Sequence, residues 1–291
     1  MRITIGVKSS EEAGYFLRNG ADEIYFSLSA ARGHRTAAFS SEADLIAAIR
    51  LARRLRRKTM LALNAVYPRE NYPAILDHAR RLTDKGLDGV IVRDPALLEY
   101  FADHDYRPYL VASVLCACFN SQTMEFYRDL GVRRFTLNSQ VMPADAARMM
   151  AALPGVETVI FVPCLCLEAN IEPYCFFPYP GGPSGACLHA CTLRYKCGAN
   201  AFRMVDTNLY YQADLLYDFH KLGVEWLKVS RQPNTPKLMA EFKVAVFLNR
   251  LLERGLGRAA FAASVVELIE RLDMNKFGPS YDFKPFPGSA R

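Results

Sequence analysis

The stretch GADEIYFSL (residues 20–28) places a glycine and polar residues directly before an apolar run, and this pattern recurs along the chain. It returns in GLDGVIV, GVRRFTL, GVETVIFV and GVEWLKV, which begin at Gly86, Gly131, Gly155 and Gly223. A glycine that ends a helix in the left-handed conformation, followed at once by an apolar run, is typical of a junction from helix to strand. The pattern therefore predicts five strands, each preceded by a helix.

Three further apolar runs have strand character without the glycine: ITIGV from Ile3, TMLALN from Thr59 and PYLVASV from Pro108. Between the runs lie amphipathic stretches with apolar residues at steps of three and four. Eight apolar strands that alternate with helices indicate parallel pairing, and a closed (β/α)8 TIM-type barrel is the economical solution for 291 residues. An open doubly wound sheet is the alternative, although its usual G-x-G-x-x-G fingerprint is absent from the sequence. The helical stretches begin at Glu42, Tyr72, Ser121 and Ala144.

The composition, with 51% hydrophobic and 23% charged residues, is that of a globular protein. We interpret residues 1–291 as one domain in which residues 237–291 form two helices, broken at Gly255 and Gly257, and a tail. The segments from Phe202 and from Asn208 are interpreted as a short hairpin before the eighth strand. Because no apolar run has the length of a signal peptide core or a membrane span, we expect a cytoplasmic protein with reduced thiols.

The net charge of +6 comes largely from a basic run between Arg50 and Lys58. We interpret this run as a solvated helix end, and a patch for nucleic acid or an acidic partner is the alternative.

Six of the eight cysteines lie in one segment, residues 164–200, which follows the seventh predicted strand. Thiolate is the soft ligand that selects iron–sulfur clusters, zinc or copper(I). The spacing from Cys166 through Cys175 and Cys187 to Cys191 lacks the paired C-x2-C of common zinc sites. The spacing favours an iron–sulfur centre without deciding between the metals, and the prediction is a [4Fe-4S] cluster held by these four cysteines. Zinc and a set of free thiols are the alternatives, and the alternative ligands are Cys164 and Cys197.

In a barrel of this type the reactive groups gather at the carboxyl ends of the strands. Cys116 and Cys118 follow the fifth strand at that end. They are either small apolar residues at the rim or place one thiol in the pocket, and no histidine near them in sequence would activate a nucleophile. The other pocket candidates, chosen by position, are Asn64, Asp94, Ser113, Asn120, Asn138 and Arg231.

Several of these stretches together resemble the peptidase U32 family, also called collagenase-like proteases, over roughly residues 3–250. The resemblance is carried by GADEIYF, LNAVYPREN, LDGVIVRDPALL, FNSQTMEFYRDLGVRRF, GACLHACTLRY and GVEWLKVSRQ. Gly185, Cys187 and Cys191 match the family's G-x-C-x-x-P-C stretch, and Ala190 replaces its proline. The resemblance implies a (β/α)8-type barrel and, as in several members, an iron–sulfur centre with four cysteine ligands.

The sequence departs from the family around the expected pocket. Where family members usually carry a histidine-glycine pair, this chain has Pro163-Cys164, and Ser139-Gln140 replace the family's Arg-Glu pair. The stretch from Lys228 to Gln232 replaces the family's Lys-Ile-Glu-Gly-Arg. These departures retain the cluster and alter the surrounding pocket.

Better-understood relatives take part in oxygen-independent hydroxylation, either of RNA bases or of a ubiquinone precursor by paired subunits. By this resemblance we predict an iron–sulfur enzyme that hydroxylates a small aromatic or nucleobase substrate, with a paired U32-type subunit or RNA as candidate partners. A U32-type peptidase, or a non-catalytic subunit that binds an iron–sulfur cluster or zinc, is the alternative. The sequence contains no H-E-x-x-H and no G-x-S-x-G motif in support of the peptidase.

Overall fold

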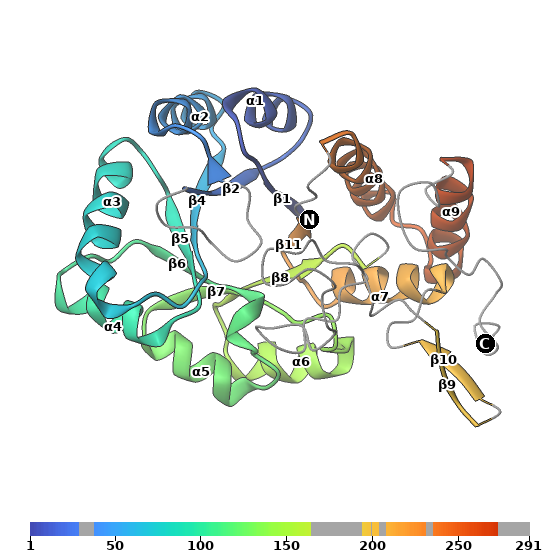
Figure 1. Ribbon diagram of the computed structural model, residues 1–291. Helices are drawn as coiled ribbons and strands as arrows, with labels where there is room; N and C mark the ends of the chain where they lie inside the picture. Colours follow the sequence, from blue (N-terminus) through green and yellow to red (C-terminus); the bar gives the residue numbers. More distant parts are fainter. Residues whose placement is uncertain (29–37, 164–193, 199, 204–207, 231–234, 273–291) are drawn as a thin grey trace.

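The computed structural model describes residues 1–28, 38–163, 194–198, 200–203, 208–230 and 235–272. Eight of the strands in these segments form a closed parallel barrel, because each pairs with the next and β1 pairs with both β11 and β2 (Figure 1). This confirms the predicted (β/α)8 TIM-type barrel and excludes the open sheet. The barrel strands are β1 (Arg2–Gly6), β2 (Glu23–Leu28), β4 (Lys58–Leu63), β5 (Gly89–Val92), β6 (Tyr109–Ala112), β7 (Val132–Thr136), β8 (Glu157–Phe161) and β11 (Trp226–Val229).

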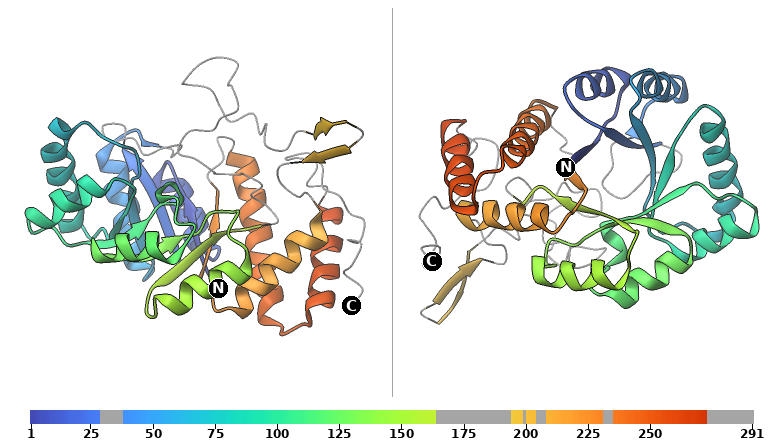
Figure 2. Two further views of the ribbon diagram at one scale, coloured as in Figure 1. Left: turned by 90° about the horizontal axis from the view of Figure 1, so that it is seen from below. Right: turned by 180° about the vertical axis from the view of Figure 1, so that it is seen from behind.

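A layer of helices surrounds the barrel, and α8 and α9 are the two helices predicted near the C-terminus (Figures 1 and 2). Short polar side chains begin several of them: Ser9 and Ser41 each accept a hydrogen bond from the backbone N–H three residues further on. The helices are α1 (Ser10–Arg18), α2 (Glu42–Arg54), α3 (Tyr72–Asp84), α4 (Pro95–Asp103), α5 (Ser121–Asp129), α6 (Pro143–Ala152), α7 (Leu209–Lys221), α8 (Thr235–Glu253) and α9 (Arg258–Arg271), with 3-10 turns η1 (Arg69–Asn71) and η2 (Val114–Cys116).

The glycines of the recurring pattern adopt the conformation that the pattern predicts. Each ends a helix with a positive φ, between 87° and 115°, and the barrel strand follows within a few residues. An L side chain rarely adopts such a φ, so glycine permits the sharp return from helix to sheet. These junctions are Gly20, Gly86, Gly131, Gly155 and Gly223.

The predicted hairpin between the segments from Phe202 and from Asn208 is wrong, because other segments pair. β9 (Arg194–Cys197) pairs antiparallel with β10 (Asn200–Arg203), and the hairpin lies apart from the barrel in each view (Figure 2). Asn208 instead begins α7, because its side chain accepts a hydrogen bond from the Tyr211 N–H at 3.1 Å. An asparagine before apolar residues therefore acted as a helix cap rather than as the start of a strand. A further two-residue strand, β3 (Ala38–Phe39), pairs with the end of β2.

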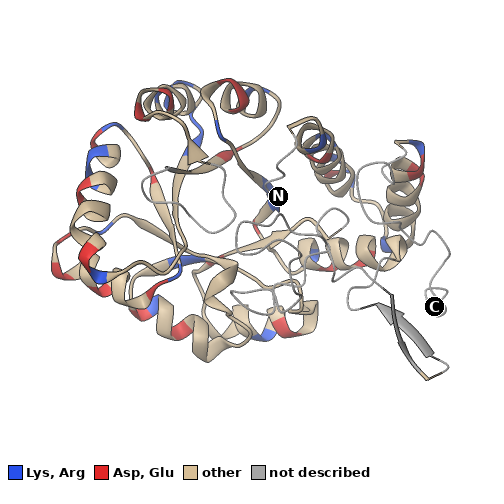
Figure 3. Ribbon diagram, in the orientation of Figure 1, with Lys and Arg blue, Asp and Glu red and all other residues tan. Residues whose placement is uncertain are grey.

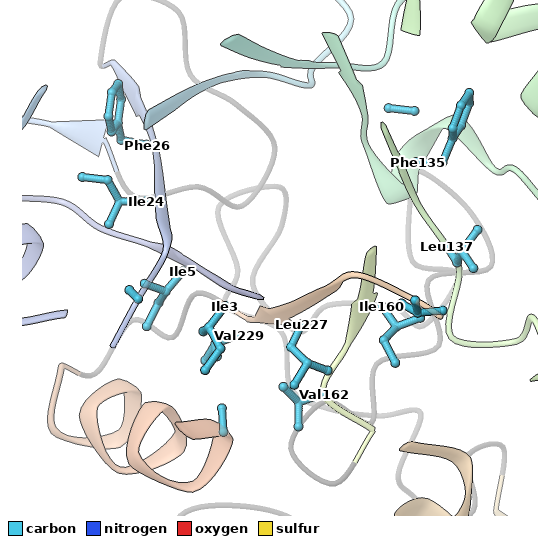
Figure 4. Close-up of a cluster of buried hydrophobic side chains, with 14 of the residues drawn as sticks. Ile3, Ile5, Ile24, Phe26, Phe135, Leu137, Ile160, Val162, Leu227 and Val229 are labelled. Carbon is cyan, nitrogen blue, oxygen red and sulfur yellow. The ribbon is translucent and has the colours of Figure 1, made fainter. Parts of the chain in front are cut away.

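The hydrophobic core lies between the strands and the helices. Figure 4 shows alternate residues of the strands, such as Ile3 and Ile5 of β1 and Leu227 and Val229 of β11, directed outward toward the helical layer. Because side chains alternate along a strand, the residues between them point into the barrel. Most charged residues lie on the outer helices (Figure 3). No helix of the described segments is long and apolar enough to cross a membrane.

The amino ends of the strands are closed by a buried ionic cluster inside the barrel. The Arg134 guanidinium donates to both carboxylate oxygens of Glu23, at 2.7 and 3.0 Å, and to Glu157 at 2.8 Å. It also lies 3.9 Å from the Trp226 ring, while the Tyr109 hydroxyl donates to Glu157. We call these five residues, Glu23, Tyr109, Arg134, Glu157 and Trp226, the base cluster; they fill the amino end of the barrel interior. Arg57, in the basic run, forms an ion pair with Asp22.

The base cluster makes stability depend on pH. Burial raises the pKa of Glu157, but hydrogen bonds from Tyr109 and the Arg134 charge outweigh it and lower the pKa from 4.5 to about 2. A carboxylate with a depressed pKa contributes stability above its unfolded pKa and loses it as the pH falls through the folded value. We therefore expect the urea concentration at the midpoint of unfolding to decrease as the pH is lowered from 4.5 to 2. In Glu157→Gln this decrease should be less steep. The exposed Glu267→Gln is the control, and an unchanged slope in Glu157→Gln would contradict the assignment.

Candidate functional site

Five buried polar side chains converge on the barrel interior at the carboxyl ends of five different strands. They come from alternate positions whose neighbours, such as Leu63 and Val229, belong to the outer core, so they face inward. None is more than 9% exposed. We call this set the polar ring; it consists of Ser27, Asn64, Ser113, Asn138 and Ser230.

Hydrogen bonds hold part of the polar ring in place. The Asn64 side-chain amide donates to the Ser113 hydroxyl at 3.4 Å, and that hydroxyl accepts from the Leu115 N–H at 3.2 Å. The Asn138 amide donates to the Val114 carbonyl at 3.2 Å. Both asparagines are therefore positioned against the 3-10 turn η2 or its cap, and the structure brings the candidates Asn64 and Ser113 into contact.

An apolar layer lies below the polar ring and separates it from the base cluster. Its packed residues include Tyr25, Met60, Ile91 and Val111. Lys228 of β11 joins this layer, with its ammonium 4.4 Å from the centre of the Tyr25 ring and 5.5 Å from that of Phe161. We call the carboxyl end of the barrel the mouth. Its outer layer carries the amide and hydroxyl groups of the polar ring, and the layer beneath carries aromatic rings and the Lys228 ammonium.

Two of the position-based candidates cap helices instead. The Asp94 carboxylate accepts hydrogen bonds from the Ala96 N–H at 3.1 Å and from the Tyr72 hydroxyl at 2.8 Å. Burial, with this hydrogen bond, raises the pKa of Tyr72 to about 12. Asn120 is exposed and accepts from the Thr123 N–H at 2.9 Å, which begins α5. The structure does not bring Asn120 to the polar ring, and Arg231 lies outside the described residues.

The two cysteines after β6 belong to the core between strands and helices. Cys116 and Cys118 are buried, and the Cys116 thiol donates to the Val92 carbonyl at 3.4 Å. Burial raises the pKa of both thiols, that of Cys118 to about 12. Both are therefore protonated at neutral pH and are poor nucleophiles. Of the two interpretations of these cysteines, this supports small apolar residues at the rim and disfavours a thiol in the pocket.

The described histidines also lie away from the mouth. His78 is in α3, His104 caps the end of α4 and His220 is in α7, all in the outer helical layer. Within the described part of the chain, no histidine thus reaches the polar ring to serve as a general base. His34 and His189 lie outside that part.

The cysteine-rich segment leaves the barrel at the mouth. β8 ends at Phe161, and the next residue, Val162, donates from its N–H to the Lys228 carbonyl at 3.1 Å. Cys197 ends β9. The described residues contain no group of three or more histidine, cysteine, aspartate or glutamate side chains that could hold a metal. The predicted ligands Cys166, Cys175, Cys187 and Cys191, and the alternative Cys164, lie outside the described residues. Their thiolates are the donor type that an iron–sulfur cluster requires.

A closed parallel barrel with its polar ring at the carboxyl ends defines this chain as a TIM-type barrel protein of the α/β class. The model of peptidase family U32 matches residues 8–253, so the chain belongs to this family. No curated protein sequence matches.

Among solved structures, the chain is similar to the U32 peptidase Mk0906, with a TM-score of 0.52 and 13% identity over 80% of this chain and 93% of that one. It is also similar to N-acetylneuraminate lyase from Mycoplasma synoviae, with a TM-score of 0.54 and 11% identity over 98% and 90% of the two chains. CdNal from Clostridium difficile, solved with mannosamine, has a TM-score of 0.51 and 11% identity over 95% and 84%. These likenesses show the barrel fold alone.

The candidates chosen by position omitted Ser230, just past β11, and several inward-facing residues inside the strands. Ser27 and Tyr25 lie inside β2 rather than after it, and Lys228 lies inside β11. The candidates were sought just past each strand end. Counting back by two along each apolar run, as side-chain alternation requires, would have found them.

Proposed function

We propose that this U32-family chain is an enzyme that carries out oxygen-independent redox modification, such as hydroxylation, of a small aromatic or nucleobase substrate. The observation that carries the proposal is the polar ring at the carboxyl ends, with the cysteine-rich segment leaving β8 at the same mouth. A [4Fe-4S] cluster held by Cys166, Cys175, Cys187 and Cys191 would supply one-electron chemistry there. Because thiolate ligands need a reducing compartment, we propose the cytoplasm as its location.

The chain's own residues would bind and orient the substrate. Asn64, Ser113 and Asn138 offer amide and hydroxyl groups at fixed positions, and the rings of Tyr25 and Phe161 offer apolar contact. The base cluster occupies the other end of the barrel interior. Substrate binding by a rigid polar rim over an apolar floor favours one orientation, which is the first requirement for selective chemistry.

Single replacement of the loop cysteines by alanine tests the cluster. Anaerobically purified protein is expected to contain iron and acid-labile sulfide, and the variants at Cys166, Cys175, Cys187 and Cys191 are expected to lose most of both, because each removes one thiolate ligand. Cys116→Ala and Cys118→Ala are matched controls that should keep the metal, since both thiols lie in the hydrophobic core. Metal analysis and the visible absorption spectrum measure the outcome.

The outcomes separate the alternatives. Zinc in place of iron would contradict the cluster, and loss of iron only in the Cys164 or Cys197 variant would reassign the ligands.

The number of ligands and the activity separate the remaining alternatives. Four thiolate ligands saturate the irons and favour electron transfer, whereas three leave one iron open to substrate. Cleavage of a protein substrate by the purified chain would favour the peptidase, although the raised pKa values of Cys116 and Cys118 argue against these two thiols as its nucleophile. RNA that copurifies would favour the nucleobase substrate. A second U32-type chain required for activity would identify the paired subunit.

A further inference from the structure

Lys228 carries a buried ammonium group inside the barrel. It is 7% exposed and lies on the inner face of β11, between the outward-directed Leu227 and Val229. Its ammonium stacks on the Tyr25 ring at 4.4 Å, and in register it stands beside Phe161 of β8. An ammonium carries three N–H donors, so it can bind a ligand oxygen in addition to its protein contacts.

A second observation points to the same place. Thr4 of β1 is the register partner of Lys228 and is 3% exposed. Its hydroxyl is buried and meets no hydrogen-bond partner among the residues that the structure describes. Because Ile3 and Ile5 point outward, Thr4 points into the barrel on the same side as Lys228. A buried hydroxyl without a partner is costly unless a ligand or water satisfies it.

The charges around this position are compatible with a bound anion. The nearest acid in register is Glu23, the partner of Thr4 on β2, and both of its oxygens already accept hydrogen bonds from Arg134. Glu157, further round the base, is likewise bound by Arg134. Arg134 and Arg2 thus pair both acids at the amino end, and Lys228 lies one layer nearer the carboxyl end, against the Tyr25 ring.

We propose that Lys228 and Thr4 bind the carboxylate of a small aromatic substrate, with the Tyr25 and Phe161 rings against its apolar part. This inference rests on the proposed function only in placing the substrate at the mouth. One ammonium and one hydroxyl match a monoanionic carboxylate, whereas a phosphate dianion usually takes several backbone amides or a second cation. The position inside an eight-stranded barrel also excludes a nucleic acid backbone, because such an interior has room for one small ligand at most.

Binding of benzoate to the full-length protein tests this inference. Isothermal titration calorimetry, with the fluorescence of Trp226, the single tryptophan, as a second measurement, is expected to show saturable binding of benzoate. Benzamide, which keeps the ring and loses the charge, should bind about tenfold more weakly or worse, because a hydrogen bond to a charged group is lost. Inorganic phosphate should not compete at equal concentration.

Variants assign the effect to the two residues. Lys228→Met should abolish the preference for benzoate over benzamide, and Lys228→Arg should restore part of it. Thr4→Val, which removes only the unpaired hydroxyl, should weaken benzoate binding without lowering the melting temperature. Lys221→Met is the matched control, since Lys221 also stacks on a tyrosine, at 5.4 Å from Tyr217, but on the outer helix α7.

Three results would overturn the inference: no saturable binding of benzoate at millimolar concentration, equal binding of benzoate and benzamide, or unchanged benzoate binding in both Lys228→Met and Thr4→Val. Competition by phosphate would replace the carboxylate with a phosphate ligand. None of these results depends on turnover or on metal content, so failure here is distinguishable from failure of the proposed redox function.

Discussion

Replacement of Arg134 by methionine is expected to lower the free energy of unfolding by about 3–5 kcal/mol. The guanidinium is fully buried and is the hydrogen-bond donor to both oxygens of Glu23, which is itself only 2% exposed. Without Arg134, the Glu23 carboxylate is left in the barrel interior without its cation, and Glu157 loses a hydrogen bond as well. Unfolding in urea, followed by circular dichroism, measures the loss.

A surface pair provides the control for this prediction. Arg271 and Glu267 form an ion pair in α9 with side chains 76% and 62% exposed. Arg271→Met is therefore expected to cost less than about 1 kcal/mol. The double variant Glu23→Leu with Arg134→Met should regain part of the stability, because it removes both buried charges. If Arg134→Met cost no more than Arg271→Met, the base cluster would have no role in closing the barrel.

The second large effect is expected at Gly89, on the inner face of β5. A Cβ atom there would lie 2.3 Å from the Tyr109 carbonyl oxygen and 2.9 Å from the Met60 sulfur. The backbone of β6 cannot move away without breaking the parallel pairing of Gly89 with Tyr109. Gly89→Ala is therefore expected to cost about 3 kcal/mol through overpacking.

Gly257→Ala is the matched control, because nothing lies within 4 Å of a Cβ atom at that position and its φ of −67° suits alanine. We expect it to cost less than about 1 kcal/mol, the loss of a helix-capping glycine. Thermal unfolding of the two variants gives the comparison. Equal melting temperatures would show that β5 can shift to accept a side chain.

The barrel could be predicted because its signals are local. Each junction glycine has the positive φ that its place before an apolar run indicates, and each of the eight apolar runs forms a barrel strand. The helices from Glu42 and Tyr72 begin at the predicted residues. The hairpin failed for a local reason as well, since Asn208 suits a helix cap as readily as a turn.

The site could be predicted only in part. Asn64, Ser113 and Asn138 were found because a residue just past a barrel strand reaches the mouth, but the same rule also selected Asp94 and Asn120, which cap helices. A short polar residue between a strand and a helix suits both roles, and sequence position does not distinguish them.

By itself the sequence determined the α/β barrel, the U32 resemblance and the place of the cysteine-rich segment after the seventh barrel strand. These depend on glycine conformation, apolar periodicity and motif spacing, which are properties of short segments. Only the tertiary structure decided which polar residues share the mouth, that Thr4 stands beside Lys228 in register, and that the Lys228 ammonium stacks on Tyr25. That convergence joins β1, β2 and β11 across more than 200 residues, because the closure of the barrel, and no local pattern, brings its last strand beside its first.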